Sequence, residues 1–287
     1  MNKGILLVLS GYLMWGCFPL YWVLLNHVNP SEVLIHRMLW AVPVLFFLVH
    51  FKSSWKNNFK ASISSKKELV FLFITAILIT INWGGYIYAV NLGRVVEASM
   101  GYFLSPVINM IGGYIFFQER ISKLKQLAVF FATVGALYYV FSGDSFPWLG
   151  FLVGFTFSAY GIARKAMSSS AVPGLYIETL ILLPFFLVFS IWFYSNFDIS
   201  FLNVDISTDI LLFLAGAVTV VPLALFNAGA KLLPMTTVGI LFLITPTLQF
   251  LVGYVMYGEL VNFNQLLGFT AVWIGLIIYC YALIKEK

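Results

Sequence analysis

Ten apolar runs, most of them about 20 residues long, are the feature that most constrains how this chain can fold. They cover residues 4–25, 32–50, 68–91, 97–117, 124–141, 147–166, 174–194, 208–230, 236–257 and 264–284. An α-helix needs about 20 apolar residues to cross the hydrocarbon core of a bilayer. The strands of a membrane β-barrel are alternating segments of about ten residues, which these unalternated runs do not resemble. The sequence therefore predicts an all-α polytopic membrane protein with ten transmembrane helices.

The composition and the missing motifs exclude most other classes of protein. Only 9% of the residues are charged and 61% are hydrophobic, whereas a soluble domain is about 25% charged. The longest connection between runs has 17 residues, which leaves no room for the nucleotide-binding domain of an ATP-driven pump. Metalloprotease, hydrolase, P-loop and redox-cysteine motifs are absent, and Cys17 and Cys280 lie in spans near opposite ends of the chain. We therefore expect no enzyme activity, no cofactor, no disulfide and no metal site.

Basic residues are distributed unevenly between the two sides of the predicted membrane. The longest connection, residues 51–67, contains five lysines, and basic connections favour the cytoplasmic side. With ten spans, this assignment places both termini and 14 of the 16 Lys and Arg residues inside. The sequence therefore predicts a multi-pass protein whose two termini are cytoplasmic. Because these charges set the orientation and are scattered over short loops, we expect no binding to nucleic acid.

The two halves of the sequence resemble each other. A shift of 141 residues places Arg37 opposite Glu178, and a shift of 140 residues aligns several identical residues. The identical pairs are Pro106 and Pro246, Gly113 and Gly253, Tyr114 and Tyr254, Glu119 and Glu259, Gly135 and Gly275, and Tyr139 and Tyr279. We interpret residues 1–142 and 146–287 as two repeats of five helices each. Because five is odd, the second repeat enters the membrane in the opposite sense, which is the inverted topology of many secondary transporters.

Three ionisable residues lie deep inside the predicted spans, several residues from their ends: His36, Arg37 and Glu178. A charged side chain at the centre of a bilayer costs at least about 2.5–3.5 kcal/mol, so it usually faces a partner or a water-filled cavity. Arg37 and Glu178 are therefore candidate substrate-binding residues, and interfacial anchoring is the alternative for Arg37. For His36, whose ring points about 100° away from Arg37 on a helix, a structural role is an equally good interpretation.

Arg37 and Glu178 lie near the starts of helices that enter the membrane from opposite sides. At about 1.5 Å per residue, two groups near opposite ends of a core about 30 Å thick would be offset by roughly 15 Å. We therefore expect two separate sites rather than an ion pair. Arg37 would attract anionic or polar groups of the solute, whereas Glu178 would pair with a basic or polar neighbour or take up a coupling proton.

Prolines and polar residues inside the spans mark a central region. Pro106 and Pro246 each remove a helical hydrogen bond, so we expect matched kinks that serve either a site or packing alone. Asn109 and Gln249 are equivalent residues that lie about one turn after these prolines. Further candidates for lining a cavity are the polar and aromatic residues Asn82, Trp83, Tyr86 and Tyr102. The alternative roles are interhelical hydrogen bonds and lipid-facing aromatic anchors.

Several stretches of the sequence are similar to those of a known family. They are His36-Arg37-Met38-Leu39-Trp40, Asn82-Trp83-Gly84-Gly85-Tyr86, Asn91-Leu92-Gly93-Arg94, Glu97-Ala98-Ser99-Met100-Gly101-Tyr102-Phe103, Pro106, Pro173-Gly174-Leu175-Tyr176-Ile177-Glu178-Thr179 and Pro246-Thr247-Leu248-Gln249-Phe250. On these residues, and over nearly its whole length, the chain resembles the EamA-type transporters of the drug/metabolite transporter superfamily and, within them, the RarD family. The resemblance implies a permease of the bacterial inner membrane with inverted repeats and a central cavity. The family name is associated with chloramphenicol sensitivity, which suggests a link to small-molecule permeation without naming a substrate.

These observations predict a secondary transporter that moves a small organic metabolite or a drug-like solute by alternating access. The two five-helix halves would rock about a mid-membrane site. The partners would be an unknown small-molecule substrate, the lipid bilayer and a coupling proton, for which Glu178 is the strongest candidate carrier. The alternatives are a non-transporting membrane scaffold or receptor, and an intramembrane enzyme, for which the sequence lacks a nucleophile and a base.

Overall fold

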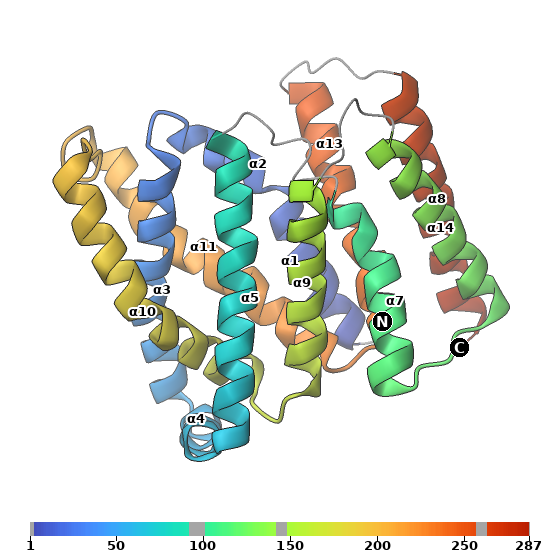
Figure 1. Cartoon of the computed structure of the whole chain (residues 1–287), viewed down its shortest axis with the longest axis horizontal. Helices are drawn as coiled ribbons and strands as arrows, with labels where there is room; N and C mark the ends of the chain where they lie inside the picture. Colours follow the sequence, from blue (N-terminus) through green and yellow to red (C-terminus); the bar gives the residue numbers. More distant parts are fainter. Residues whose placement is uncertain (1–2, 92–100, 142–147, 257–262, 287) are drawn as a thin grey trace.

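Helices are the only regular secondary structure over the residues that the computed structural model describes, which are 3–91, 101–141, 148–256 and 263–286 (Figure 1). The α-helices are α1 (Lys3–Gly16), α2 (Phe18–Trp22), α3 (Pro30–Phe51), α4 (Ser53–Ser64), α5 (Lys66–Asn91), α7 (Ser105–Phe117), α8 (Lys123–Phe141), α9 (Trp148–Ala166), α10 (Ala171–Asn196), α11 (Ile206–Ala230), α12 (Met235–Phe242), α13 (Ile244–Met256) and α14 (Phe263–Lys285). Two 3-10 helices, η1 (Val23–Leu25) and η2 (Gly101–Leu104), follow α2 and precede α7.

Each of the ten predicted apolar runs forms a helical segment. The first run is the segment α1–α2–η1, the fourth is η2 with α7, and the ninth is α12 with α13. Seven segments of the described chain are long and apolar enough to cross a membrane, and Gly101–Phe117 is a shorter apolar helix. The prediction of an all-α polytopic membrane protein is confirmed. Cys17 and Cys280 are both free and exposed.

One helix was missing from the prediction, because residues 51–67 were expected only to connect two spans. Residues Ser53–Ser64 form α4, an amphipathic helix. Trp55 and Phe59, spaced four residues apart, pack against the main apolar core, whereas Lys56 and Lys60, with the same spacing, are exposed. The segment was overlooked because it is too polar to span a membrane, although its apolar residues have helical spacing.

The N-termini of α3 and α11, two helices that carry site residues, are capped by side-chain oxygens. α3 starts with Pro30, and the side chain of Asn29 accepts a hydrogen bond from the Ser31 amide at 2.9 Å. α11 starts after Asp205, whose carboxylate accepts a hydrogen bond from the Thr208 amide at 2.8 Å. These two caps fix the residues at which α3 and α11 begin. Arg37 on α3 and Thr219 on α11 contact each other further along these helices.

The two halves of the sequence interleave in space. The most extensive helix pairs are α8 with α14, α3 with α11, α1 with α11, α5 with α9, α3 with α10 and α7 with α12, and each joins a helix from residues 1–142 to one from residues 146–287. One apolar core lies among η2, α8, α12 and α14, and these helices form a bundle on the right of Figure 1, while α3, α5, α10 and α11 lie on the left. The sequence halves are therefore not two separate bodies.

The α8–α14 pair is held at very close range by two glycines that are equivalent in the repeat. A Cβ atom on Gly135 would lie 2.6 Å from the Gly268 carbonyl oxygen, and one on Gly275 would lie 2.6 Å from the Ala128 carbonyl oxygen. Small residues let membrane helices approach until their backbones touch, because van der Waals packing drives helix association where no water is expelled.

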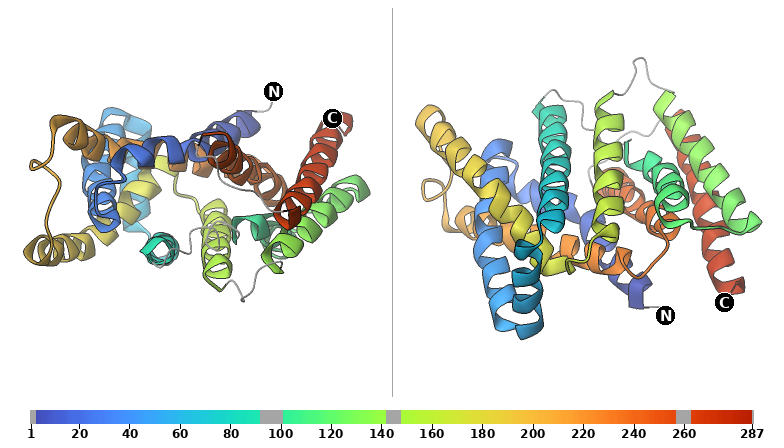
Figure 2. Two further views of the ribbon diagram at one scale, coloured as in Figure 1. Left: turned by 90° about the horizontal axis from the view of Figure 1, so that it is seen from above. Right: turned by 60° about the horizontal axis from the view of Figure 1, so that its bottom comes forward.

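Both chain ends lie toward the side of the molecule that carries α4 (Figures 1 and 2). The connections from η1 to α3 and from α10 to α11 lie on the opposite side (Figure 1). We refer to these two sides as the α4 end and the opposite end. Arg37 lies seven residues after the start of α3, and Glu178 lies seven residues after the start of α10. The two helices start at different ends, so the two residues approach the middle from opposite sides.

Candidate functional site

The side chain of Arg37 lies between two indole rings. Its Cζ atom is 5.1 Å from the ring centroid of Trp22 on α2 and 5.2 Å from that of Trp83 on α5. Its Nε atom donates a hydrogen bond of 3.0 Å to the hydroxyl of Thr219 on α11. Cation–π contacts of this kind stabilise a guanidinium that has lost part of its water, by about 0.5–2 kcal/mol each. Arg37 is thus held in a fixed orientation while remaining half-buried.

Over the part of the chain that the structure describes, no carboxylate forms an ion pair with Arg37. Among the described residues, the ion pairs involve other cations, and the groups that interact electrostatically with Arg37 are the phenols of Tyr86 and Tyr102. An ionisable side chain inside a membrane span normally has a partner or faces water. A planar guanidinium with spare N–H donors is well suited to bind a carboxylate or phosphate group of a solute.

Six aromatic rings form a continuous cluster, and one of them, Tyr102, also interacts with Arg37. They belong to Tyr12, Trp15, Tyr102, Phe157, Phe226 and Phe242. Neighbouring centroids in this ring cluster are 5.0 to 6.3 Å apart, and the rings come from both halves of the sequence. Phe226 of this cluster lies nearer the α4 end than Thr219, the hydrogen-bond partner of Arg37, because α11 runs from the opposite end toward the α4 end. A solute at Arg37 would therefore meet a wall of rings on the side toward α4.

Glu178 lies beyond the ring cluster in a separate polar network. Its Oε1 atom accepts a hydrogen bond of 2.5 Å from Thr75 on α5, and its Oε2 atom accepts one of 3.2 Å from Tyr160 on α9. The Tyr160 hydroxyl in turn accepts a hydrogen bond of 2.8 Å from the amide of Asn227. Arg37 and Glu178 thus lie in different networks, and no ion pair of the described residues joins them.

The cation that neutralises Glu178 is Arg164, which the sequence did not single out. The Arg164 Nε atom lies 3.6 Å from Oε1 of Glu178, and both side chains are almost completely buried. The remaining guanidinium nitrogens donate to the Ser169 hydroxyl and to the carbonyl groups of Ser170 and Ala171, at 3.1 to 3.2 Å. Arg164, one of the 14 basic residues that the sequence places on the cytoplasmic side, is therefore part of the buried interior.

The comparisons with known proteins agree with one another. The EamA-like transporter family matches residues 2–141. The protein RarD of Escherichia coli (strain K12) is 35% identical over 281 residues, which are 97% of this chain and 94% of that protein. The chain belongs to the RarD family of EamA-like transporters. The uncharacterized transporter YojE of Bacillus subtilis is 35% identical over 288 residues, covering all of this chain and 96% of YojE.

A more distant RarD relative and a solved structure complete the comparison. The chloramphenicol-sensitive protein RarD of Pseudomonas aeruginosa is 29% identical over 96% of this chain and 93% of its own length. A solved structure described only as the crystal structure of a protein matches with a TM-score of 0.73 over 96% of both chains. Its sequence identity of 13% shows the shared fold alone. This RarD-family protein is therefore a multi-pass membrane transporter with the fold of that structure.

His36 has a hydrogen-bond partner at each ring nitrogen. Nδ1 accepts a hydrogen bond of 2.9 Å from the indole of Trp40, and Nε2 lies 3.1 Å from the hydroxyl of Tyr194. Because Nδ1 is an acceptor, a neutral ring carries its proton on Nε2. The ring is buried, and its centroid lies 4.5 Å from that of the Phe201 ring, with an angle of 48° between the two planes. Of the two interpretations of His36 in this RarD-family protein, this arrangement favours the structural one.

The three neutral polar candidates, Asn82, Asn109 and Gln249, have different surroundings. Asn82 donates a hydrogen bond of 2.7 Å to the Val153 carbonyl on α9 and also interacts with the hydroxyl of Tyr102. Gln249 donates a hydrogen bond of 3.2 Å to the Trp15 carbonyl, next to the ring cluster. Asn109 is buried, and its carbonyl oxygen has no hydrogen-bond partner. Of the three, Asn82 lies nearest the Arg37 site, because it contacts a residue that also interacts with Arg37.

Both candidate kink prolines lie at breaks between helices rather than within bent helices. Pro106 is the second residue of α7, which directly follows η2, and Pro246 is the third residue of α13, which follows α12 after Leu243. The breaks occur at equivalent places in the two halves. A proline near the start of a helix loses no intrahelical hydrogen bond, so the chain accommodates the missing donors by ending one helix and starting another.

Polar contacts also tie the two halves together at the α4 end. Glu119, just after α7, accepts hydrogen bonds of 2.6 Å from Lys165 on α9 and 2.9 Å from the amide of Met235, where α12 begins. A carboxylate at a helix N-terminus is stabilised by the exposed N–H groups and the helix dipole.

Lys231, just after α11, makes polar contacts within the second half of the sequence. It donates hydrogen bonds to the carbonyl groups of Met167 and Ser169. Desolvation, reinforced by the charge of Arg164, lowers the pKa of Lys231 to about 8.

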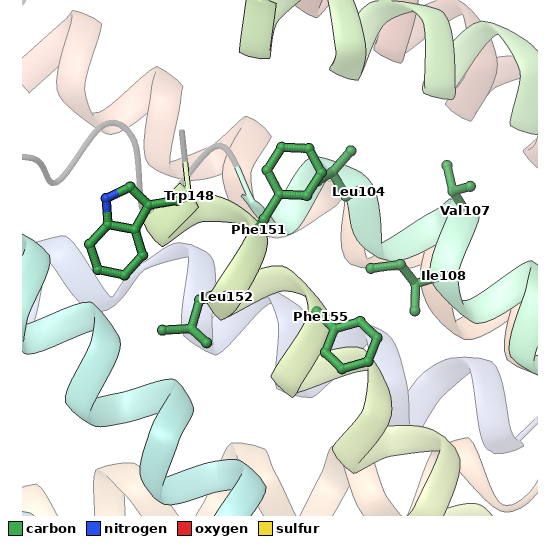
Figure 3. Close-up of a pocket in the computed structure, with 7 residues that line it drawn as sticks. All are labelled: Leu104, Val107, Ile108, Trp148, Phe151, Leu152 and Phe155. Carbon is green, nitrogen blue, oxygen red and sulfur yellow. The ribbon is translucent and has the colours of Figure 1, made fainter. Parts of the chain in front are cut away.

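A groove on the outside of the bundle has no polar lining. It lies between α7 and α9, has a volume of about 570 Å³ and is lined by apolar side chains only (Figure 3). These are Leu104, Val107, Ile108, Trp148, Phe151, Leu152 and Phe155. None of the predicted site residues of this RarD-family protein lines it. Its chemistry matches the lipid tails that surround a membrane protein.

Proposed function

We propose that the protein is a secondary transporter that carries a small organic solute with an anionic group by alternating access. The observation that supports this most directly is Arg37, a half-buried cation inside a membrane span that is held by two indoles and a hydroxyl and forms no ion pair with any carboxylate of the described residues. An organic anion would supply the missing counter-charge, and the indoles would pack against its apolar part. Asn82, Trp83, Tyr86 and Tyr102 would complete the binding site.

The ring cluster and the Glu178 network would form the barrier on the far side of the solute. A solute at Arg37 reaches the α4 end only if the rings separate and the contacts of Arg164 and Glu119 rearrange. Because each tight helix pair joins the two halves of the sequence, the bodies that rock would be mixed bundles rather than residues 1–142 against 146–287. Glu178 would take up the coupling proton when its contact with Arg164 opens.

The α4 end would face the cytoplasm, because it carries the five lysines of residues 51–67. To test this, we would replace Cys17 and Cys280 with serine and introduce a single cysteine for Asn57 or Asn203, both of which are exposed. An impermeant maleimide added to intact cells should label the cysteine at 203 and should label that at 57 only after permeabilisation. Labelling at 57 but not at 203 in intact cells would refute the proposed orientation.

Solute flux into proteoliposomes tests the proposed function. We would first screen organic anions, together with chloramphenicol because of the name of the Pseudomonas aeruginosa relative, for thermal stabilisation of the protein. The hits should then accumulate in liposomes faster with a pH gradient than without one, and Glu178→Gln should remove this difference. A ligand that binds but never crosses the membrane would indicate a receptor or scaffold and would contradict the proposal.

A further inference from the structure

The lysines at the α4 end form an exposed surface that the transport mechanism does not use. Lys52, Lys56, Lys60, Lys66 and Lys67 lie within 16 consecutive residues, and all five are exposed. None of them belongs to an ion pair of the described residues. The nearest acidic residue in the sequence, Glu68, instead accepts hydrogen bonds of 2.9 and 3.0 Å from the amides of Ser168 and Ser169. Apart from the cation–π contact of Lys52 with Trp55, the positive charge of this surface is thus left without a partner among the described residues.

The rotation of α4 about its own axis is fixed by the contacts of its other face. Phe59 lies 5.3 Å from the ring of Tyr176 on α10, and Asn58 accepts a hydrogen bond of 2.7 Å from the Ser170 amide. Lys56, Lys60 and Ile63 are spaced i, i+4 and i+7, so they share the outward face of the helix. Ile63 is 42% exposed, so this face combines two lysines with an apolar side chain, the combination found on helices that lie at a membrane interface.

The helix α4 lies at the ends of two long apolar helices, α3 and α5. Figure 1 shows the helix end-on below α3 and α5, so it runs across the ends of the spanning helices rather than alongside them. It directly follows the span α3, whose last residue Phe51 is 85% exposed. Clusters of four to eight basic residues immediately next to a span, or on an amphipathic helix, are attracted to anionic phospholipids.

We infer that α4 binds the headgroups of anionic phospholipids in the leaflet at its end of the molecule. Lys56 and Lys60 would contact the phosphates, while Ile63 and Phe51 would enter the upper part of the acyl region. Apolar side chains beside the lysines favour a lipid surface over a soluble polyanion, which offers no apolar layer. Asn58 contacts Ser170 in the connection before α10, and Phe59 contacts Tyr176 on α10. Bound lipid would therefore stabilise the part of the protein that contains the Arg164–Glu178 pair.

Lipid retention measured by native mass spectrometry tests this inference without any transport assay. The purified protein would be titrated with phosphatidylglycerol or phosphatidylcholine, and with free glycerol phosphate as a soluble headgroup. We expect phosphatidylglycerol to bind preferentially, and the double variant Lys56→Gln/Lys60→Gln to weaken its binding by about tenfold or more. The matched control is Lys123→Gln/Lys285→Gln, which removes the same charge at exposed positions away from α4 and should change binding less than threefold.

Three outcomes would overturn the inference. The first is an equal loss of binding in both double variants, which would show a general charge effect. The second is no preference for phosphatidylglycerol in the parent protein. The third is competition by free glycerol phosphate at the same concentration as the lipid, which would indicate a site for soluble anions instead of a membrane surface. Melting temperatures measured without lipid would establish that both double variants are folded.

Discussion

Replacing Arg164 with methionine should lower the free energy of unfolding by about 3–5 kcal/mol, because Glu178 is then left as an unpaired carboxylate in the interior. The substitution also removes the donors that hold the Ser169 hydroxyl and the carbonyl groups of Ser170 and Ala171. Unfolding in mixed detergent micelles measures the loss. The control is Lys123→Met, which removes an exposed cation and should change the stability by about 0.5 kcal/mol or less.

A double variant separates the lost ion pair from the other lost contacts. Replacing a complete buried pair by neutral groups is often close to neutral in stability, whereas removing one partner is costly. We therefore expect Arg164→Met/Glu178→Gln to be more stable than Arg164→Met alone. If the double variant is no more stable, the loss comes from the connection between α9 and α10, and the charge of Glu178 is not the reason.

The second large effect is expected at Arg37, where lysine should reduce solute flux by about tenfold or more at low solute concentration. Lysine keeps the charge, but it lacks the planar group that fits between Trp22 and Trp83 and the Nε–H that Thr219 accepts. Since the lost contacts orient the solute-binding group, the change should appear mainly as a raised KM. Flux in proteoliposomes over a range of solute concentrations measures it.

The matched control for this experiment is Arg120→Lys, the same substitution at an exposed position between α7 and α8. This variant should transport like the parent protein. If Arg37→Lys also does so, Arg37 is an anchor and not a binding residue. The solute site would then have to be sought at the neutral polar residues Asn82, Asn109 and Gln249.

The spans could be predicted from the sequence because membrane insertion depends on local and nearly additive properties. About 20 apolar residues are enough to identify a helix that crosses the bilayer, whatever lies beside it. The breaks at Pro106 and Pro246 could be located for a similar reason, since a proline acts on its own helix. In each of these cases, the information lies within one turn or one span of the chain.

The partners of the candidate residues could not be predicted, because they depend on contacts between distant segments. Arg164 and Lys165 are adjacent cations at the end of one span, and the sequence does not show that the first contacts Glu178 and the second contacts Glu119. Thr219 is one of several hydroxyl residues in its span, and only the packing of α11 against α3 brings it to Arg37. α4 was missed because its sequence is too polar for a span, and the packing of Trp55 and Phe59 against the core depends on distant segments.

The interleaving of the two halves has a consequence for how the chain is made. While the ribosome synthesises residues 146–287, the helices of the first half are already in the membrane without their main neighbours. Several polar groups of the first half find their partners only later, as when Asn82 meets the Val153 carbonyl, Thr75 meets Glu178 and Glu119 meets Lys165. Insertion of the spans and completion of the packed structure are therefore separate stages, and the nascent protein passes through an interval in which chaperones and proteases can recognise its unpaired surfaces.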